Sequence, residues 1–554
     1  MYGDGVNLAS RVESIGISGG ILISDKVNYA IKNHSGIQTQ SLGHFEFKNI
    51  IEPVEIFTIT NSGIKIPNGS ELKGKLKGTK KSIAVLPFEN MSPDPENEYF
   101  SDGIAGEILN ALVKVEGLQV IARTSSFVFK GKNVDVREIG RLLNVEHILE
   151  GSVRKAGKRV RITAQLVSAL DGIHLFSESY DRSLEDIFAV QDEIAQKITN
   201  RLRKHLGETE HRELLVTAPT ENFEAYEKYL QGVFHLNQWG DEAALNAMPY
   251  FYEAIEMQND FSQAHAHLAT CYLFQAFGGK MSWPDAHQHA IIHINRALEL
   301  DSDDLEALYA LTAFQSFLEW DWVGLKKTVD KIINLNPGKV NCYHAIATYH
   351  CILGDIEAAI KAEKKGLQLD PLSVQSNLYL GVYHAWSAQL DEAIRYLDKV
   401  LELDPKHRTA TEFKGWVFLY KEQYQLAEQW FQKIEPAMGY RLHRSTCLGY
   451  LYTKTNRMDK AKTCLREIEQ LDATAIGHTF SIDLAILHAG FGNSNEVFTY
   501  LEKAIKTKIG DTSMFYGAPV FNSYKSDARF QKLLDLVGTG LRVDKLQVEK
   551  IQPP

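Results

Sequence analysis

The sequence predicts a multidomain protein that joins a short α/β segment, an α+β domain and an all-α solenoid of helical repeats. Three observations support this fold class. A helical pattern followed by short strand patterns fills about the first 60 residues. Polar and apolar residues alternate over 159–166, as in a strand with one buried face. In the second half of the chain, small residues recur every 34 positions, which is typical of helical repeats.

Length and composition are compatible with this organisation. The chain has 554 residues, enough for about three domains of ordinary size. Its hydrophobic content is 44% and its net charge is −10, with no basic block, so we expect no nucleic-acid partner. No stretch has the pattern of a leader or the length of a membrane-crossing segment, so we expect a cytoplasmic protein without a membrane partner.

Two further features of composition carry predictions. Residues 61–81 break the periodicity and are interpreted as a linker, whose lysines lie in a solvated, Gly-rich setting: Lys73, Lys75, Lys77, Lys80 and Lys81. The cysteines form no CxxC pair and all fall in the helical half, which predicts buried, reduced thiols: Cys271, Cys342, Cys351, Cys447 and Cys464.

The first residues carry polar side chains at a spacing that chemistry can use. If residues 6–14 are helical, Asn7 and Arg11 project from the same face. A planar guanidinium beside an amide suits an anionic, oxygen-rich ligand such as a phosphate. The alternative interpretation is that Arg11 is a solvated helix residue and Asn7 a cap. Asp4 precedes the helix, where a carboxylate ordinarily caps it or favours its dipole.

Residues 1–60 resemble the C-terminal end of a class III adenylate/guanylate cyclase catalytic domain. The resemblance lies in the run 3–14, in Gly19–Ser24 and in the strand patterns at 42–50 and 54–57. It implies conversion of ATP or GTP to a cyclic nucleotide and pyrophosphate, with Asn7 orienting the ribose and Arg11 stabilising charge on the α-phosphate. It also implies Mg²⁺ or Mn²⁺, held in the family by two aspartates that precede the matched region.

The sequence departs from the family pattern at the metal-binding residues, and this departure leads to an expectation about activity. Because no counterpart of the two metal-binding aspartates is found here, we expect no metal site in this chain, a truncated form of a longer cyclase, and no activity from the chain alone. The residues that choose adenine or guanine are missing as well. A cyclase-domain dimer partner is a further possibility, since family active sites form between two catalytic domains.

Residues 82–206 predict an α+β domain. Strands are expected at 83–88, 118–122, 127–129, 147–155, 159–166 and 174–180, with a hairpin turn at Gly157-Lys158, and helices at 102–115, 136–143 and about 184–206. Asp102 and Glu107 are an acidic pair or, in the interpretation we favour, a capped helix start. The runs Ala84–Phe88, Phe100–Gly103 and Ile148–Val153 resemble the amino-terminal domain of TolB and the related FlgO-type domain.

Residues 220–540 follow the 34-residue period in three independent columns. A small residue is needed where two antiparallel helices cross closely, and proline suits the turn after the second helix. The pattern resembles the tetratricopeptide repeat (TPR), with 530–537 as a polar-faced cap that closes the stack, and it implies a protein partner bound in the repeat groove. The columns are Ala359, Ala393, Ala427 and Ala461; Gly381, Gly415 and Gly449; and Pro337, Pro371 and Pro405.

Other candidates in the repeats are interpreted structurally. His287, His289 and His293 lack a further ligand at matching spacing, so a solvated helix face is favoured over a metal site. Trp320 and Trp322 are expected to pack between helices. Candidate surface residues for a partner are Lys421, Arg441, Arg444 and Arg457.

Three functions are compatible with these patterns. The first is the regulatory part of a bacterial-type nucleotide cyclase that takes part in signal transduction. The second is a non-enzymatic TPR scaffold with a vestigial cyclase segment. The third is a regulator related to bacterial transcription factors, although no recognition helix is evident near the N-terminus.

Overall fold

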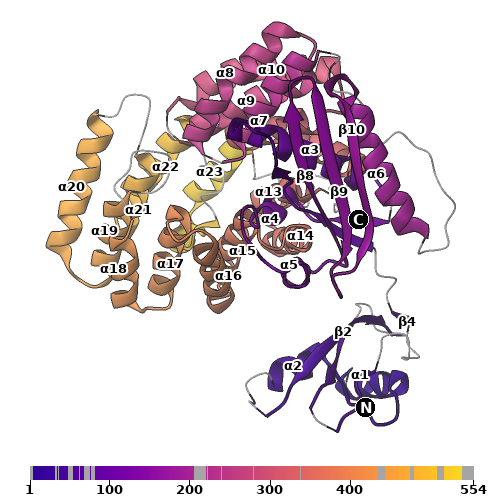
Figure 1. Ribbon diagram of the computed structural model, residues 1–554. Helices are drawn as coiled ribbons and strands as arrows, with labels where there is room; N and C mark the ends of the chain where they lie inside the picture. Colours follow the sequence, from indigo (N-terminus) through magenta and orange to yellow (C-terminus); the bar gives the residue numbers. More distant parts are fainter. Residues whose placement is uncertain are drawn as a thin grey trace. The chain divides into compact units, whose positions relative to one another are not determined.

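The computed structural model describes residues 4–31, 34, 36–47, 54–61, 63–67, 75–76, 81–115, 117–204, 220, 222–238, 240–278, 280–336, 339–434, 443–474, 480–507 and 517–538. The chain forms two compact units, Met1–Lys81 and Ser82–Pro554, here called unit 1 and unit 2 (Figure 1).

In the residues of unit 1 that the structure describes, a four-stranded antiparallel sheet packs with two helices. Its strands follow the order β1-β3-β2-β4. The core forms where Val12 and Ile15 pack with Phe45, Phe47 and Ile56, so the predicted helix and the closing strands bury a common apolar face. The elements are α1 (Asp4–Ile15), β1 (Leu22–Ser24), α2 (Asp25–Ile31), β2 (Thr39–Glu46), β3 (Val54–Ile59) and β4 (Lys75–Leu76).

Part of the stretch predicted as a linker belongs to this sheet. Leu76 pairs with Phe45 and Lys75 with Glu46, so β4 extends the edge formed by β2. The prediction of a linker over 61–81 is wrong here, because backbone hydrogen bonds to an open strand edge do not require apolar side chains. Lys73, Lys77 and Lys80 lie outside the described residues.

Unit 2 begins with a six-stranded mixed sheet. Its strands follow the order β10-β9-β8-β5-β7, and β6 pairs with β8. The central strand β8 runs parallel to β5 and antiparallel to β9. The strands are β5 (Lys81–Val85), β6 (Glu89–Asn90), β7 (Leu118–Val120), β8 (His147–Ala156), β9 (Arg159–Ser168) and β10 (His174–Ser183).

Helices cover both faces of this sheet because side chains alternate along its central strands. Ile83 and Val85 of β5 pack into the core formed with α3 and α6, whereas Ala84 belongs to a second core formed with α5. The helical elements are η2 (Pro95–Asn97), α3 (Glu98–Val113), α4 (Arg123–Phe127), α5 (Val136–Leu143), η3 (Leu184–Asp186) and α6 (Ile187–Lys204).

Several local predictions can be compared with this part of the fold. The alternation at 159–166 is confirmed, since Val160 and Ile162 are buried while Arg159 and Arg161 are exposed. Gly157 has a φ of +58° in the predicted hairpin turn. The predicted strand at 127–129 is wrong: its first residue ends the short helix α4. Three residues give too short a pattern to separate a buried strand from a helix end.

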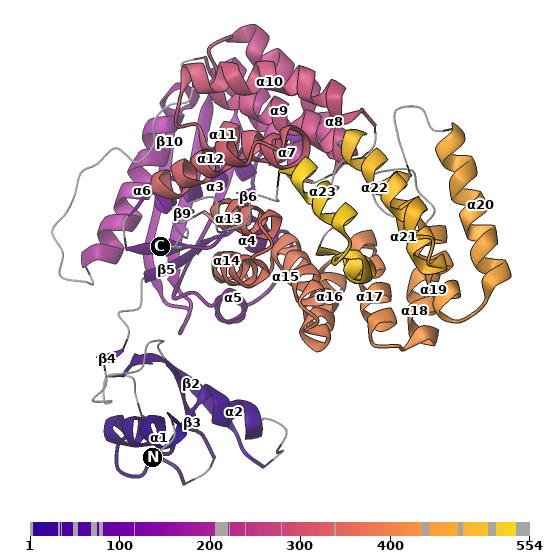
Figure 2. The same cartoon turned by 180° about the vertical axis from the view of Figure 1, so that it is seen from behind.

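The second half of unit 2 is a stack of antiparallel helix pairs (Figure 2). The first pairs are α7 (Phe223–Leu236), α8 (Asp241–Met257), α9 (Ser262–Phe277), α10 (Trp283–Leu300), α11 (Leu305–Phe314), a π-helical turn η4 (Gln315–Glu319) and α12 (Trp322–Leu335). They are followed by α13 (Val340–Ile352), α14 (Ile356–Leu369), α15 (Val374–Trp386), α16 (Leu390–Leu403), α17 (Arg408–Tyr420), α18 (Tyr424–Gln432), α19 (Arg444–Lys454), α20 (Met458–Thr474), α21 (Ser481–Phe491) and α22 (Ser494–Thr507).

The repeat columns occupy the positions that the period predicts. Ala359, Ala393, Ala427 and Ala461 lie in second helices and are fully buried. Gly415 lies in α17, where an added Cβ atom would come within 2.3 Å of the Phe431 ring. Pro371 follows α14 and Pro405 follows α16, whereas Pro337 lies outside the described residues.

The sheet and the first repeats share one hydrophobic core. Helix α3 packs on the sheet on one side and on α7 on the other. At Gly103, an added Cβ atom would come within 2.8 Å of Leu230, so the two helices meet closely. The predicted ranges 82–206 and 220–540 therefore lie together in one compact unit.

The C-terminal segment contains η6 (Pro519–Tyr524) and α23 (Ala528–Val537). Helix α23 begins beside α22, but its last residue accepts a hydrogen bond of 2.8 Å from the Trp322 indole of α12. The predicted cap at 530–537 is thus a helix that packs on α22, and it also reaches α12, which the prediction did not include. The apolar pattern marks the buried face of a helix but not which surface covers it.

Two predictions from composition are also tested. All five cysteines are buried, and each is a free thiol. Among the described residues, no helix has the length and apolar content needed to cross a membrane.

Candidate functional site

Helix α1 carries the residues that the sequence singles out. Positions 7 and 11 lie one turn apart on this helix, as predicted. Arg11 is exposed, and its backbone carbonyl accepts a hydrogen bond of 2.7 Å from the Ser14 hydroxyl. The side chain of Asn7 lies outside the described part of the chain. The guanidinium of Arg11 is thus accessible to a ligand from solvent.

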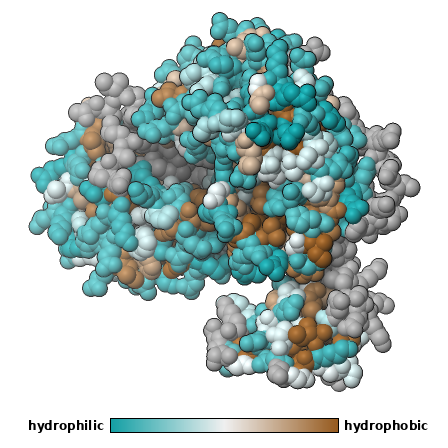
Figure 3. All heavy atoms as spheres, in the orientation of Figure 1, coloured by the Kyte–Doolittle hydropathy of each residue, from teal (hydrophilic) through white to brown (hydrophobic). Residues whose placement is uncertain are grey.

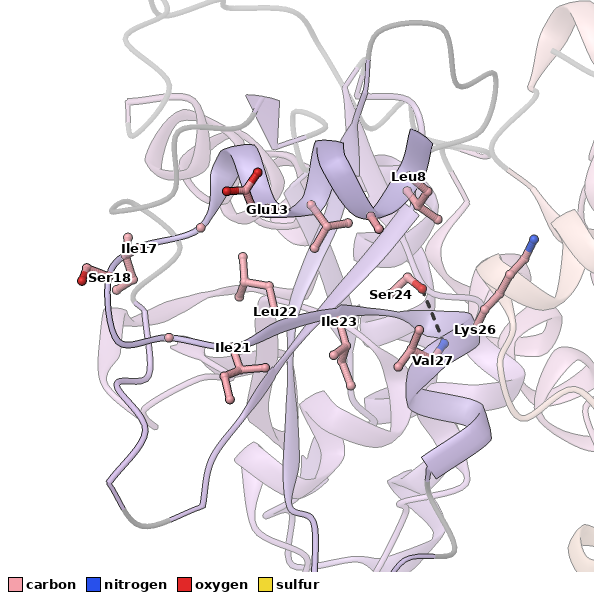
Figure 4. A pocket seen from close by; sticks show the side chains of 14 residues that line it. Leu8, Glu13, Ile17, Ser18, Ile21, Leu22, Ile23, Ser24, Lys26 and Val27 are labelled. Carbon is pink, nitrogen blue, oxygen red and sulfur yellow. Dashed lines mark hydrogen bonds between the residues drawn. The ribbon is translucent and has the colours of Figure 1, made fainter. Parts of the chain in front are cut away.

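A pocket of about 670 Å³ opens beside the same helix (Figure 4). Charged side chains line it only at Glu13 and Lys26, and at one end the Ser24 hydroxyl accepts a hydrogen bond of 3.5 Å from the Val27 amide. The lining residues are Leu8, Ala9, Val12, Glu13, Gly16, Ile17, Ser18, Gly20, Ile21, Leu22, Ile23, Ser24, Lys26 and Val27.

The pocket and the predicted pair belong to different sides of α1. Residues 8, 9, 12 and 13 line the pocket and share one side of the helix. With about 100° between successive residues, positions 7 and 11 fall on the other side. The structure therefore does not bring Arg11 into this pocket. The sequence pattern did not reveal the pocket, because it depends on how β1 and α2 lie against α1.

Hydrophobic side chains reach the surface of unit 1 (Figure 3). Ile21 and Val27, which line the pocket, are each 45% exposed. Strand β1 stands at the end of the strand order, so its outer edge is unpaired among the described residues. An apolar pocket beside an open strand edge indicates a surface suited to packing rather than to phosphate chemistry.

Asp102 does not cap a helix, contrary to the favoured prediction. Helix α3 begins four residues earlier, at Glu98, and Asp102 lies buried within it. Its carboxylate is 2.6 Å from the Lys130 ammonium and 3.6 Å from the Arg123 guanidinium. Burial raises the pKa of Asp102 despite these cations, and burial lowers the pKa of Arg123 to about 10. No local sequence pattern predicts this cluster, because Arg123 and Lys130 approach Asp102 only in the folded domain.

Helix α4, which begins at Arg123, lies at a junction between the sheet and the repeats. The short helix α4 lies against the turn after α14, where the Thr124 and Ser125 hydroxyls donate to the Asp370 carboxylate. The Leu372 amide donates to the Ser125 hydroxyl over 2.7 Å, and the Ala122 amide donates to the Leu369 carbonyl over 2.8 Å. Side-chain and backbone bonds thus fix the two parts together.

The histidines of α10 contact aromatic rings and a carboxylate, and His289 and His293 both stack on Tyr272. His287 contacts Glu319 at 2.7 Å, whereas the His289 ring stacks on Tyr272. His293 shares a 2.9 Å contact between Nδ1 atoms with His265. Burial, followed by the imidazoles of His265 and His289, lowers the pKa of His293 to about 4. Within the described part of the chain, no three His, Cys, Asp or Glu residues form a group that could hold a metal ion.

The same finding applies to the ion implied by the cyclase resemblance. The described residues provide no group of three or more such side chains for Mg²⁺ or Mn²⁺, and the use of either ion stays a prediction.

Two of the candidate partner-binding cations of the repeats form ion pairs within the chain. Lys421 forms an ion pair with Asp391, and Arg457 forms one with Glu428 at 2.9 Å. Arg444 begins α19, and Arg441 lies outside the described residues. Trp322 is buried and packs between helices, as predicted.

Comparison with known families supports the presence of TPR repeats and identifies a second family model that matches the chain. A tetratricopeptide-repeat family model matches residues 387–407 and 448–474, so the protein contains TPR repeats. A model described as "HilA/YgeH-like transcriptional regulator, second domain" matches residues 79–197. The TolB-like identity of residues 82–206 stays a prediction.

A similar protein from Rhizobium meliloti (strain 1021) is named "Putative adenylate cyclase 3". It is 38% identical over 326 residues, which are 57% of this chain and 54% of the relative. This chain thus spans about half the length of the relative that it matches.

Two solved structures are similar to part of this chain. The TPR protein YrrB, described as having an unusual peptide-binding site, is 21% identical and covers 33% of this chain and 89% of its own, with a TM-score of 0.24. PilF of Pseudomonas aeruginosa is 15% identical and covers 39% of this chain and 94% of its own, with a TM-score of 0.31.

Proposed function

We propose that this chain is the C-terminal, regulatory part of a class III nucleotide cyclase, which in its longer form converts ATP to cyclic AMP and pyrophosphate. The observation that carries the proposal is the 38% identity to a protein named as an adenylate cyclase. The aligned 326 residues exceed the 81 residues of unit 1, so at least part of the similarity lies in unit 2. We therefore propose that the two proteins share at least part of the regulatory region.

In this proposal α1 supplies two groups to the reaction. Arg11 stabilises negative charge that develops on the α-phosphate, and Asn7 orients the ribose one helical turn earlier. The exposure of Arg11 supports this role because a buried, paired guanidinium would not reach a nucleotide. The proposal assigns the metal-binding carboxylates to catalytic sequence outside this chain.

The α/β part of unit 2 is proposed to receive a signal, and the repeats to bind a protein. The shared core of α3 and α7 supports a mechanical link between the two, since a change in one alters the packing of the other. A TolB-like fold for residues 82–206 is part of this proposal. The repeats support protein binding because such stacks offer long surfaces to extended or helical partners.

The test is a cyclase assay on two forms of the protein. The first is this chain, and the second is the protein extended upstream of Met1 in its genomic reading frame. We expect cyclic AMP from the extended form alone. Product from this chain would overturn the assignment of the metal-binding residues, and product from neither form would favour the alternative of a non-enzymatic TPR scaffold.

A further inference from the structure

The C-terminal segment Gly517–Gly538, here called the returning segment, packs across several repeats. At its start, an added Cβ atom on Gly517 would lie 2.8 Å from the Trp386 indole of α15. In its middle, Tyr524 meets Phe498 of α22 edge to face at 5.9 Å. At its end, the Val537 carbonyl accepts the hydrogen bond from Trp322 of α12. The segment thus reaches helices that belong to distant repeats.

Its buried residues form one apolar face. Phe530, Leu533 and Val537 are 1%, 4% and 2% exposed and follow the i, i+3, i+7 spacing of one helix side. They belong to the same hydrophobic cluster as Trp322 and the repeat core. Gln531 and Lys532 are exposed on the other side. The returning segment is therefore an amphipathic helix laid on the repeats, with aromatic residues before it.

The helix depends on this surface for its own stability. Helix α23 has 10 residues, whereas isolated helices shorter than about 12–15 residues are marginal in water. Arg529 adds a hydrogen bond of 2.8 Å to Asn495 of α22, which is exposed. Because apolar packing holds most of the segment, a helix with a similar apolar face can occupy the same surface.

We propose that the surface formed by α12, α15 and α22 is a docking site for an amphipathic helix of a partner protein, and that the returning segment occupies it as an internal competitor. This proposal rests on the proposed protein-binding role of the repeats, for which it names the kind of partner, and it is independent of cyclase chemistry. The partner is expected to carry an aromatic residue followed by apolar residues at i+3 and i+7, like Phe530, Leu533 and Val537.

The chain carries its own copy of the docking helix, and this copy affects how binding of an external helix is detected. A tethered segment competes at an effective concentration of about millimolar, so an external copy binds measurably only after the internal copy is weakened. A change confined to the returning segment does this without altering the surface. Phe530→Glu with Leu533→Glu places two charges on the buried face, and Gln531→Glu with Lys532→Glu is the matched change on the exposed face.

The experiment measures binding of a fluorescent peptide with the sequence of residues 517–538 to the full chain. We expect the F530E/L533E chain to bind it at least tenfold more tightly than either the unaltered chain or the Q531E/K532E chain. A peptide that carries the same two glutamates should not bind. A folded F530E/L533E chain that binds no better than the unaltered chain would overturn the proposal.

A second measurement covers the case in which the F530E/L533E chain does not fold. Amide hydrogen exchange of the unaltered chain compares α23 with α15–α19. We expect α23 amides to exchange faster, through a local opening that leaves the repeats intact. If they exchange only together with α15–α19, the segment is a fixed part of the fold and the proposal fails. Neither readout involves a cyclic nucleotide, so failure here is distinct from failure of the cyclase assignment.

Discussion

Ser125 and Asp370, which lie 245 residues apart in the sequence, are joined by a hydrogen bond from the serine hydroxyl to the carboxylate. The same carboxylate accepts from Thr124, and the Ser125 hydroxyl accepts from the Leu372 amide. Asp370 is only 1% exposed, so its charge depends on these donors. This small network attaches the α/β part to the turn between two repeats.

The first prediction concerns this junction. Asp370→Ala removes the shared acceptor and leaves the hydroxyls of Thr124 and Ser125 without it, which should cost about 2 to 4 kcal/mol of unfolding free energy. Urea unfolding measures the loss, and amide exchange should rise first in residues 119–126. Asp404→Ala is the matched control, since Asp404 ends α16 in the equivalent turn and accepts from the nearby Lys406 amide. Equal losses in both variants would refute a special role for the junction.

The second prediction concerns the glycine column of the repeats. Gly415→Ala directs a methyl group at the Phe431 ring and should destabilise unit 2 by about 1 to 3 kcal/mol through overpacking. Gly106→Ala is the control because its added Cβ atom meets nothing within 4 Å, and this change should stabilise α3 by up to about 1 kcal/mol. Combining Gly415→Ala with Phe431→Leu should cost less than the two single changes together, and strict additivity would count against the clash.

These two sites show what the sequence could and could not predict. The Gly415 column is set by a close crossing of neighbouring helices, and local contacts of this kind repeat with the period. Asp370 was predictable only as the residue before a turn proline. Its partners come from α4, at a sequence distance that no period connects.

The candidate sites also divide into those that a local sequence pattern predicts and those that depend on the folded structure. The helix that carries Asn7 and Arg11 follows from its local pattern and is observed as α1. The pocket beside it depends on three elements and was not predicted. Asp102 was misassigned as a cap because its cations, Arg123 and Lys130, approach only in the folded domain. Likewise, the pattern of α23 shows an apolar face but does not identify Trp322 as its contact.

The third prediction is a dependence of stability on pH. The pKa of His293 is about 4 in the folded chain, below the ordinary value of 6.5, so the unfolded chain binds more protons between these values. The contribution of the neutral His293 imidazole to the free energy of unfolding is complete above pH 6.5 and is lost as the pH falls toward 4. The groups that face this imidazole are His265 and Tyr272 of α9, His289 of α10 and Tyr252 of α8.

His293→Gln should therefore make the urea midpoint fall less steeply between pH 6.5 and 4. After allowance for its partial exposure, the difference should be about 1 kcal/mol over this range. His174→Gln is the matched loss of an imidazole, because His174 is exposed on β10 and is not among the groups that face His293. A His293→Gln profile parallel to that of the unaltered chain would exclude this group as a source of the acid sensitivity.

The last prediction tests Arg11 in the extended protein, under the proposed cyclase function. Arg11→Lys keeps the charge but loses the planar fork that holds two phosphate oxygens, so kcat should fall by about 10- to 100-fold, and Arg11→Ala should reduce it by about 100- to 1,000-fold. If Arg11 acts only in the transition state, KM for ATP should change little. Glu13→Ala is the matched control, since Glu13 is also exposed on α1 but lines the pocket on the other side. An equal loss in the Glu13 variant would mean that α1 as a whole, rather than the guanidinium, supports the reaction.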